Sequence, residues 1–399
     1  MRLKLSQRVL GLEASPTLAI TSRAKELKKK GHDIVSFTAG EPDFDTPSHI
    51  KEAAIRAINE GHTKYTPVGG IDELKEAIIE RYRKDHSLEY SKEEILVSCG
   101  GKHSFYNLCQ ALLDQGDEVI VPAPYWVSYP PMVRLAGGVP RIVSTDEKDG
   151  FKISPEELEN AITEKTKAIV INSPSNPTGA VYSHEELKAL VEIAVERGVL
   201  VISDEIYDKL VYGEVESVCA AGVCEGAREN TIVLNGVSKS YSMTGWRIGY
   251  ALGPKELIDA MMRIQSQSTS NPTSISQWAS VAAISGSQQC VEEMKREFKK
   301  RRDIMVDGLN SIEGISCIRP HGAFYVFANV SALFGRRYND RVINSSVEFA
   351  SFLLDTVEVC VVPGAGFGDD RFVRLSFACS EEDIKKGVER IREAVGLLR

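Results

Sequence analysis

Residues 231–249 read TIVLNGVSKSYSMTGWRIG, and this stretch decides both the fold class and the chemistry that the chain can perform. Its first five residues, Thr231–Asn235, are mostly β-branched or aliphatic, which is typical of a short buried strand. Lys239 therefore follows the carboxyl end of a strand, where open α/β sheets bind ligands. With small hydroxyl residues on both sides and Arg247 eight positions further on, this lysine suits a Schiff-base site beside a phosphate. In isolation, it would be interpreted as a solvated surface lysine.

Two other aliphatic runs end in polar clusters in the same way. Residues 167–172 lead into NPTG at 176–179, and residues 198–203 lead into DEIY at 204–207. Ligands bind outside the carboxyl ends of the strands in open α/β sheets. We therefore expect the three polar clusters to meet at one edge of a sheet.

In this order and spacing, the three segments resemble the class I/II aminotransferases, which are pyridoxal phosphate enzymes of fold type I. The resemblance covers nearly the whole chain and continues in GEPDF at 40–44, KYTP at 64–67, PYW at 124–126 and VRLSF at 373–377. It implies an α/β fold in which a large domain holds a mostly parallel seven-stranded sheet between helices, and a smaller α/β domain is built from both termini. The expected boundaries are 47–286 for the large domain and 1–46 with 287–399 for the small one, with an interdomain helix near 290–311.

The alternation of amphipathic helices with short aliphatic runs independently predicts a mostly parallel sheet covered by helices. Helices are expected at 48–59, 71–84, 102–113, 184–197, 254–263 and 276–284.

Composition narrows the class of protein further. A chain of 399 residues with 43% hydrophobic content can bury a large core, and a net charge of −8 argues against nucleic acid or a membrane surface as partner. No window is long and apolar enough to predict a membrane span. The eight cysteines show no C-x-x-C spacing, so neither a disulfide framework nor a metal site is expected. We expect a cytoplasmic protein with reduced thiols.

The resemblance implies a role for each residue around pyridoxal 5'-phosphate. Lys239 would hold the cofactor as an internal aldimine and later move a proton between the substrate Cα and the cofactor C4'. Asp204 would face the pyridine nitrogen and keep it protonated. Tyr207 and Asn176 would hydrogen-bond the phenolic oxygen, and Trp126 would stack on the ring. Each has an ordinary structural alternative: a helix N-cap, a core aromatic residue or a turn asparagine.

A phosphate site is predicted from backbone N–H groups, a hydroxyl and a cation. Gly101 and Lys102 follow an aliphatic run and open a helix, an arrangement that directs N–H groups toward an anion. Ser238 would add a hydroxyl, and Arg247 would add a two-pronged guanidinium contact. By resemblance, Tyr65 reaches the phosphate of the neighbouring subunit, which implies a homodimer with shared active sites.

The resemblance also implies a site for the substrate α-carboxylate. Arg374 lies in an alternating strand at 372–377, where an unpaired charge would be costly. It matches the family arginine that binds this carboxylate through two hydrogen bonds, and Gly40 and Asn176 would complete the site.

Substrate specificity depends on a second cation. An arginine that one branch of the family uses for the distal carboxylate is missing from residues 265–272. Lys102 matches the lysine that the bacterial aspartate aminotransferase branch uses instead, with Ser15 and Thr17 as neighbouring hydroxyls. We therefore expect ping-pong transamination between L-aspartate or L-glutamate and a 2-oxo acid such as 2-oxoglutarate or oxaloacetate.

Other functions on the same scaffold stay open. A broad-specificity aromatic or alanine aminotransferase, or a carbon–sulfur β-lyase, would share Lys239, Asp204 and Arg374. Glu13 stands where some prephenate-accepting relatives carry a basic residue, so prephenate is not expected as a substrate. A non-catalytic regulatory protein would carry an added DNA-binding domain or lack the lysine, and the sequence shows neither.

Overall fold

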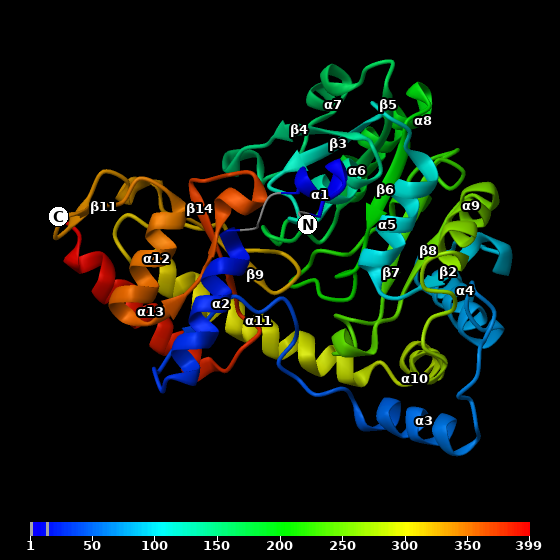
Figure 1. Ribbon diagram of the computed structural model, residues 1–399, viewed down its shortest axis with the longest axis horizontal. Helices are drawn as coiled ribbons and strands as arrows, with labels where there is room; N and C mark the ends of the chain where they lie inside the picture. Colours follow the sequence, from blue (N-terminus) through cyan, green and yellow to red (C-terminus); the bar gives the residue numbers. More distant parts are fainter. Residues whose placement is uncertain (1–2, 13–15) are drawn as a thin grey trace.

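The computed structural model describes residues 3–12 and 16–399, which form a large sheet unit and a smaller unit connected by the helix α11 (Gln289–Asn310; Figure 1). The large unit is built on a seven-stranded sheet in which only β8 runs antiparallel to its neighbours. In spatial order the strands are β2 (Ile95–Ser98), β8 (Gly249–Leu252), β7 (Thr231–Gly236), β6 (Leu200–Asp204), β5 (Thr166–Asn172), β3 (Glu118–Ala123) and β4 (Val139–Ser144). The mostly parallel seven-stranded sheet expected from the resemblance is confirmed.

Helices cover both faces of this sheet because successive residues of a buried strand point to opposite sides. In β5, Ala168 and Val170 belong to one apolar cluster, and Ile169 and Ile171 belong to another. The helices of the large unit are α3 (Ser48–Asn59), α4 (Asp72–His86), α5 (Gly101–Leu112), α6 (Tyr129–Leu135), α7 (Pro155–Ala161), α8 (His184–Arg197), α9 (Lys255–Ser266) and α10 (Ser274–Ser285).

The smaller unit combines segments from both ends of the chain. Its sheet has the antiparallel order β13 (Val362–Pro363), β14 (Phe372–Ser376), β9 (Tyr325–Asn329), and the strand β1 (Val35–Ser36) pairs in parallel with β12 (Val359–Cys360). A hairpin of β10 (Arg337–Tyr338) and β11 (Arg341–Val342) and the helices α2 (Pro16–Lys29), α12 (Ser346–Val357) and α13 (Glu381–Leu397) complete it. The short helix α1 (Gln7–Leu10) lies instead against α6 of the large unit.

The helix α11 connects the two units and also fixes a loop that reaches the sheet edge. Arg301 on this helix donates from Nη1 to both carboxylate oxygens of Asp43, at 2.8 and 2.9 Å, and lies 5.1 Å from the ring centroid of Phe44. The segment that begins at Gly40 is thereby anchored to α11. Among the described helices, none has both the length and the apolar character that crossing a membrane requires.

Candidate active site

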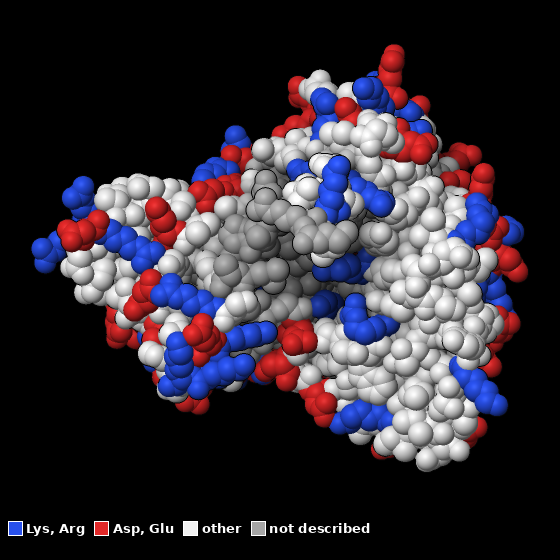
Figure 2. Space-filling view, viewed as in Figure 1, with Lys and Arg blue, Asp and Glu red and all other residues white. Residues whose placement is uncertain are grey.

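The predicted polar clusters meet in a cavity of about 320 Å³ at the carboxyl ends of β5, β6 and β7, and residues of the smaller unit complete its wall. Figure 2 shows a hollow near the centre of the molecular face, with lysine and arginine side chains at its edge. The expected residues that line the cavity are Gly40, Gly101, Lys102, Trp126, Asn176, Asp204, Tyr207, Ser238, Lys239, Arg247 and Arg374. The convergence of three strand ends that the sequence predicts is therefore confirmed.

Lys239 follows β7 and projects into the cavity. Its Nζ donates a hydrogen bond of 2.5 Å to the carbonyl oxygen of Gly40. Burial lowers the pKa of Lys239 to about 8, and the positive charges of Arg247 and Arg374 act in the same direction, against the attraction of Glu41. A much larger fraction of this lysine is a free amine at neutral pH than for an ordinary surface lysine.

Asp204 ends β6 at the same edge, and its carboxylate is held from two sides. Tyr129 donates from its hydroxyl to Oδ2 at 2.5 Å, and the backbone N–H of Ile206 donates to Oδ1 at 3.2 Å. Burial raises the pKa of Asp204, and both hydrogen bonds oppose that rise. Tyr129 was not predicted from the sequence, although it stands three residues after Trp126 at helical spacing.

Arg374 in β14 lies on the opposite wall and is almost fully buried. It donates from Nη1 to Asn176 Oδ1 at 3.0 Å and from Nη2 to the carbonyl oxygen of Thr38 at 3.1 Å. Its Nε is buried and has no hydrogen-bond partner among the described residues. Burial lowers the pKa of Arg374, and its hydrogen-bond partners among the described residues are an amide oxygen and a carbonyl oxygen, not a carboxylate. A guanidinium with an unpaired buried N–H group is suited to bind a carboxylate.

A second anion site lies where α5 begins. Gly100, with φ of +93°, precedes the helix, and a Cβ at this position would lie 2.4 Å from Nη2 of Arg247. A Cβ at Gly249 would lie 2.2 Å from the backbone nitrogen of Gly101. These two glycines therefore allow the first turn of α5 and the guanidinium to approach each other. Together with the hydroxyl of Ser238, the site matches the donors that a phosphate group requires.

Comparisons with known proteins agree with this geometry. Residues 32–391 match the family Aminotransferase class I and II. The chain belongs to the class I and II aminotransferases. The aspartate aminotransferase of Geobacillus stearothermophilus is 54% identical over 392 residues, which cover 98% of each chain.

Solved structures of this aminotransferase family superpose closely on the chain. An aspartate aminotransferase from Rhizobium meliloti has a TM-score of 0.97 at 43% identity and covers 100% of both chains. The Thermus thermophilus aspartate aminotransferase, solved with maleate, has a TM-score of 0.92 at 47% identity and covers 99% of this chain and 100% of its own. The chain is thus an aminotransferase of fold type I that depends on pyridoxal phosphate, and the amine, carboxylate and anion site around its cavity fit that cofactor.

Lys102 and Trp126 form a further part of the aminotransferase cavity. The Lys102 Nζ lies 5.0 Å from the centroid of the Trp126 ring, close enough for a cation–π contact. Burial lowers the pKa of Lys102, and the positive charge of Arg247 lowers it further. Lys102 is exposed where it borders the cavity and makes no ion pair among the described residues, so an anionic group in the cavity could pair with it.

Of three further expected residues, the structure describes the side chain of only one, Tyr65. Tyr65 is 91% exposed and does not line the cavity of its own chain. Ser15 lies outside the described residues, as does the side chain of Thr17 in α2. Glu13, on which the expectation about prephenate depends, also lies outside them.

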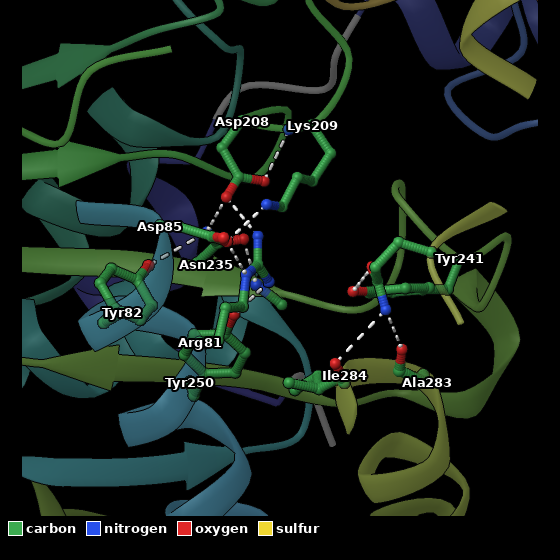
Figure 3. Close-up of polar contacts among 12 residues, drawn as sticks. Arg81, Tyr82, Asp85, Asp208, Lys209, Asn235, Tyr241, Tyr250, Ala283 and Ile284 are labelled. Carbon is green, nitrogen blue, oxygen red and sulfur yellow. Dashed lines mark hydrogen bonds and ion pairs between the residues drawn. The ribbon is translucent and has the colours of Figure 1, made fainter. Parts of the chain in front are cut away.

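A buried polar network lies beneath the cavity (Figure 3). Arg81 on α4 forms an ion pair with Asp208, which directly follows Tyr207, and donates to the Tyr250 hydroxyl at 2.7 Å. Asn235, which also borders the cavity, donates to Oδ2 of Asp208 at 3.1 Å. The network therefore ties the segment that carries Tyr207 to β7, the strand that precedes Lys239.

Proposed function

We propose that this aminotransferase transfers the amino group between L-aspartate or L-glutamate and 2-oxoglutarate or oxaloacetate. The observation that carries the proposal is that the cavity holds two cations besides Lys239 and Arg247, namely Arg374 and Lys102, neither of which is paired with a carboxylate among the described residues. A dicarboxylate substrate would satisfy both. The names of the Geobacillus and Rhizobium relatives, and the maleate in the Thermus structure, support the same class of ligand.

Lys239 is proposed as the residue that binds the cofactor and then moves the proton. Pyridoxal phosphate, when bound, supplies an aldehyde that condenses with amines and a protonated ring that accepts the electron pair released at the substrate Cα. The pKa of about 8 makes the Lys239 amine available as a nucleophile near neutral pH. With the cofactor bound, this nitrogen would take the proton from the substrate Cα and return it to the cofactor carbon two atoms away, beyond the intervening nitrogen.

Asp204, Tyr207 and Asn176 are proposed to face the cofactor ring. A carboxylate that burial destabilises gains most from a cationic partner, so Asp204 is suited to keep a proton on the ring nitrogen. The hydroxyl of Tyr207 and the amide of Asn176 border the cavity as hydrogen-bonding groups for the phenolic oxygen. Trp126 is proposed to stack on the ring, and Gly101, Ser238 and Arg247 to hold the phosphate.

Arg374 is proposed to orient the substrate through its α-carboxylate. The unpartnered Nε and the two Nη atoms form one planar fork, and Asn176 and the backbone of Thr38 fix the orientation of that fork. Gly40 borders the same end of the cavity and contributes its backbone. Holding the carboxylate in this way places the Cα hydrogen within reach of one base and reduces the entropy lost in the reaction.

We further propose that the active enzyme is a cytoplasmic homodimer. The tyrosine at position 65 is 91% exposed in a single chain, although large aromatic side chains are usually buried. An interface between two copies would cover it and bring it to the phosphate of the neighbouring subunit. Sedimentation equilibrium of the holoenzyme tests the oligomeric state, and a monomer that turns over would contradict this part of the proposal.

The substrate assignment is tested by adding amino acids one at a time to the holoenzyme and following the conversion of its absorbance. L-aspartate and L-glutamate should convert it at far lower concentrations than L-alanine, L-phenylalanine or L-cysteine. The change Lys102→Met should lower kcat/KM for aspartate about 10- to 100-fold, which is the loss expected for a hydrogen bond to a charged group, and leave alanine nearly unaffected.

Lys165→Met, which removes an exposed lysine outside the cavity, is the matched control and should change neither value. A preference for alanine or phenylalanine would contradict the acidic substrate and indicate an apolar one. Release of pyruvate and sulfide from cysteine would indicate a β-lyase. Prephenate belongs in the same series, and its conversion would contradict the expectation drawn from Glu13.

A further inference from the structure

Tyr325, the first residue of β9, touches three parts of the site but has no role in the mechanism described so far. Its hydroxyl oxygen lies 2.9 Å from the hydroxyl oxygen of Tyr207. The guanidinium carbon of Arg374 lies 4.4 Å from the centroid of its ring. A Cβ built on Gly40 would lie 3.6 Å from the same hydroxyl. The side chain is fully buried and borders the cavity.

This contact joins the two units of the molecule. Tyr207 follows β6 of the large sheet, whereas Tyr325 and Arg374 belong to the strands β9 and β14 of the smaller unit (Figure 1). Tyr325 pairs with Ser376, two residues beyond Arg374, so the tyrosine and the arginine lie on the same face of their sheet. The position of the Tyr325 ring under the guanidinium is thus set by strand register.

The direction of the hydrogen bond between the two tyrosines follows from proton counting. Each hydroxyl has one proton to donate. When Tyr207 donates its proton into the cavity, it can receive a hydrogen bond only as an acceptor, and Tyr325 must be the donor. Hydrogen bonds in such a chain strengthen one another. The charge of Arg374 above the ring makes Tyr325 a better donor, and it opposes the rise that burial causes in the pKa of Tyr325.

We propose that Tyr325 is a positioning residue that couples occupation of Arg374 by a substrate carboxylate to the strength of the hydrogen bond that Tyr207 donates into the cavity. This inference rests on the proposed roles of Arg374 and Tyr207. A bound carboxylate neutralises the guanidinium, which makes Tyr325 a weaker donor to Tyr207. Tyr207 in turn donates more weakly to the phenolic oxygen beside the Lys239 nitrogen. That oxygen keeps more negative charge, so the Lys239 nitrogen holds its proton more tightly when a substrate carboxylate is present.

The test uses the holoenzyme and maleate, a dicarboxylate that has no amino group to react. The absorbance of the holoenzyme against pH reports the pKa of the Lys239 nitrogen, with and without saturating maleate. In the wild-type protein, maleate should raise this pKa. Tyr325→Phe should raise it already without maleate, by about 0.5 to 1 unit, the shift that corresponds to one net hydrogen bond. The further rise caused by maleate should fall to less than half of the wild-type value.

Two matched variants test whether Tyr325→Phe changes the pKa of the Lys239 nitrogen through Tyr207, or only because a buried hydroxyl has been removed. Tyr212 is also fully buried in the same apolar cluster and donates to the carbonyl oxygen of Ala323, so Tyr212→Phe should cost similar stability without changing the maleate response. In a Tyr207→Phe background, Tyr325→Phe should produce no additional shift, because the residue through which it acts is absent.

The outcomes distinguish this inference from the proposed function. A maleate response in Tyr325→Phe as large as in the wild type overturns the coupling, and so does an additional shift in the Tyr207→Phe background. Wild-type protein that does not bind maleate would refute the dicarboxylate assignment instead. In that case, the change in the pKa of the Lys239 nitrogen that Tyr325→Phe causes without maleate still decides whether Tyr325 acts on Tyr207.

Discussion

Two arginines, Arg81 and Arg374, are buried to a similar depth but have opposite surroundings. Arg81 is 6% exposed and Arg374 is 7% exposed. Arg81 lies against the carboxylate of Asp208 and the hydroxyl of Tyr250, beneath the cavity. Arg374 lies in the cavity wall, where its only hydrogen-bond partners among the described residues are an amide oxygen and a backbone carbonyl.

The difference identifies Arg374 as the buried charge whose anionic partner a ligand can supply. A buried charge is costly unless it is paired, and the folded chain satisfies this requirement for Arg81 with its own carboxylate. For Arg374 the compensating anion must come from outside the described chain, which is what a carboxylate substrate supplies. Burial lowers the pKa of Arg374 in the absence of that anion. The first arginine should therefore be needed mainly for stability, and the second mainly for catalysis.

The largest expected effect is on catalysis at Arg374. Arg374→Leu should lower kcat/KM for aspartate by about 10³-fold, since truncating one partner of a buried charge pair costs roughly 4 kcal/mol. The free energy of unfolding without substrate should stay the same or rise, because an uncompensated buried charge is removed. Steady-state kinetics and urea unfolding of the same preparation measure both quantities. A large loss of stability would show that Arg374 resembles Arg81 after all.

The next effect is on stability at Arg81. Arg81→Met should lower the free energy of unfolding by about 3 to 5 kcal/mol, because it leaves the Asp208 carboxylate buried without its cation. The double variant with Asp208→Asn should recover most of this loss, since the orphaned charge is then absent. Guanidinium unfolding of the holoenzyme checks both variants. If the double variant is as unstable as the single one, packing and not charge is what Arg81 contributes.

Much of the fold was predictable because its signals are local in the sequence. The predicted helices 48–59 and 184–197 coincide with α3 and α8, and the strand predicted at 231–235 lies within β7. Buried parallel strands and amphipathic helices have distinct periodicities that do not depend on distant residues. The edge strand β4 was missed because it is half exposed and its pattern, with exposed Val139 and Ile142, carries little hydrophobic signal.

The site was predictable where each residue lies within a short motif, and not where it depends on long-range contacts. Asp204 is the last residue of β6, and Lys239 and Asn176 follow the ends of β7 and β5 within about four residues. Tyr129 contacts Asp204 across 75 positions and Tyr325 contacts Tyr207 across 118, so no local pattern indicates either contact. The role of Tyr65 and the exact boundaries of the domains stay predictions.

The two arginines should also differ in their effect on the pKa of Lys239, because only Arg374 lies in the same cavity. The apoprotein should capture pyridoxal phosphate at a rate that rises with pH with a midpoint near pH 8, because burial and then Arg247 and Arg374 lower the pKa of Lys239 to about 8. Between pH 7 and pH 9 the free-amine fraction should grow about tenfold, and Arg374→Leu should move the midpoint upward because a like charge is removed. Arg81→Met, outside the cavity, should leave the midpoint unchanged. Stopped-flow absorbance measures the capture rate, and a rate that still rises steeply above pH 9 would contradict the lowered pKa.

The smallest expected effect is at the outer end of the Arg81 network, where Lys209 pairs with Asp85 (Figure 3). The two side chains are 28% and 24% exposed, so water screens the pair, and Lys209→Ala should cost only about 0.2 to 1 kcal/mol of unfolding free energy. Asp85 keeps Arg81 as a neighbour, with 3.7 Å from Nε to Oδ2, so the substitution leaves no buried charge unpaired. Urea unfolding at low and high salt should show that this small loss shrinks further as salt increases. A loss of unfolding free energy close to that of Arg81→Met would mean that Arg81, Asp85, Asp208 and Lys209 stabilise the fold as one unit. Removing an exposed charge would then cost as much stability as removing a buried one.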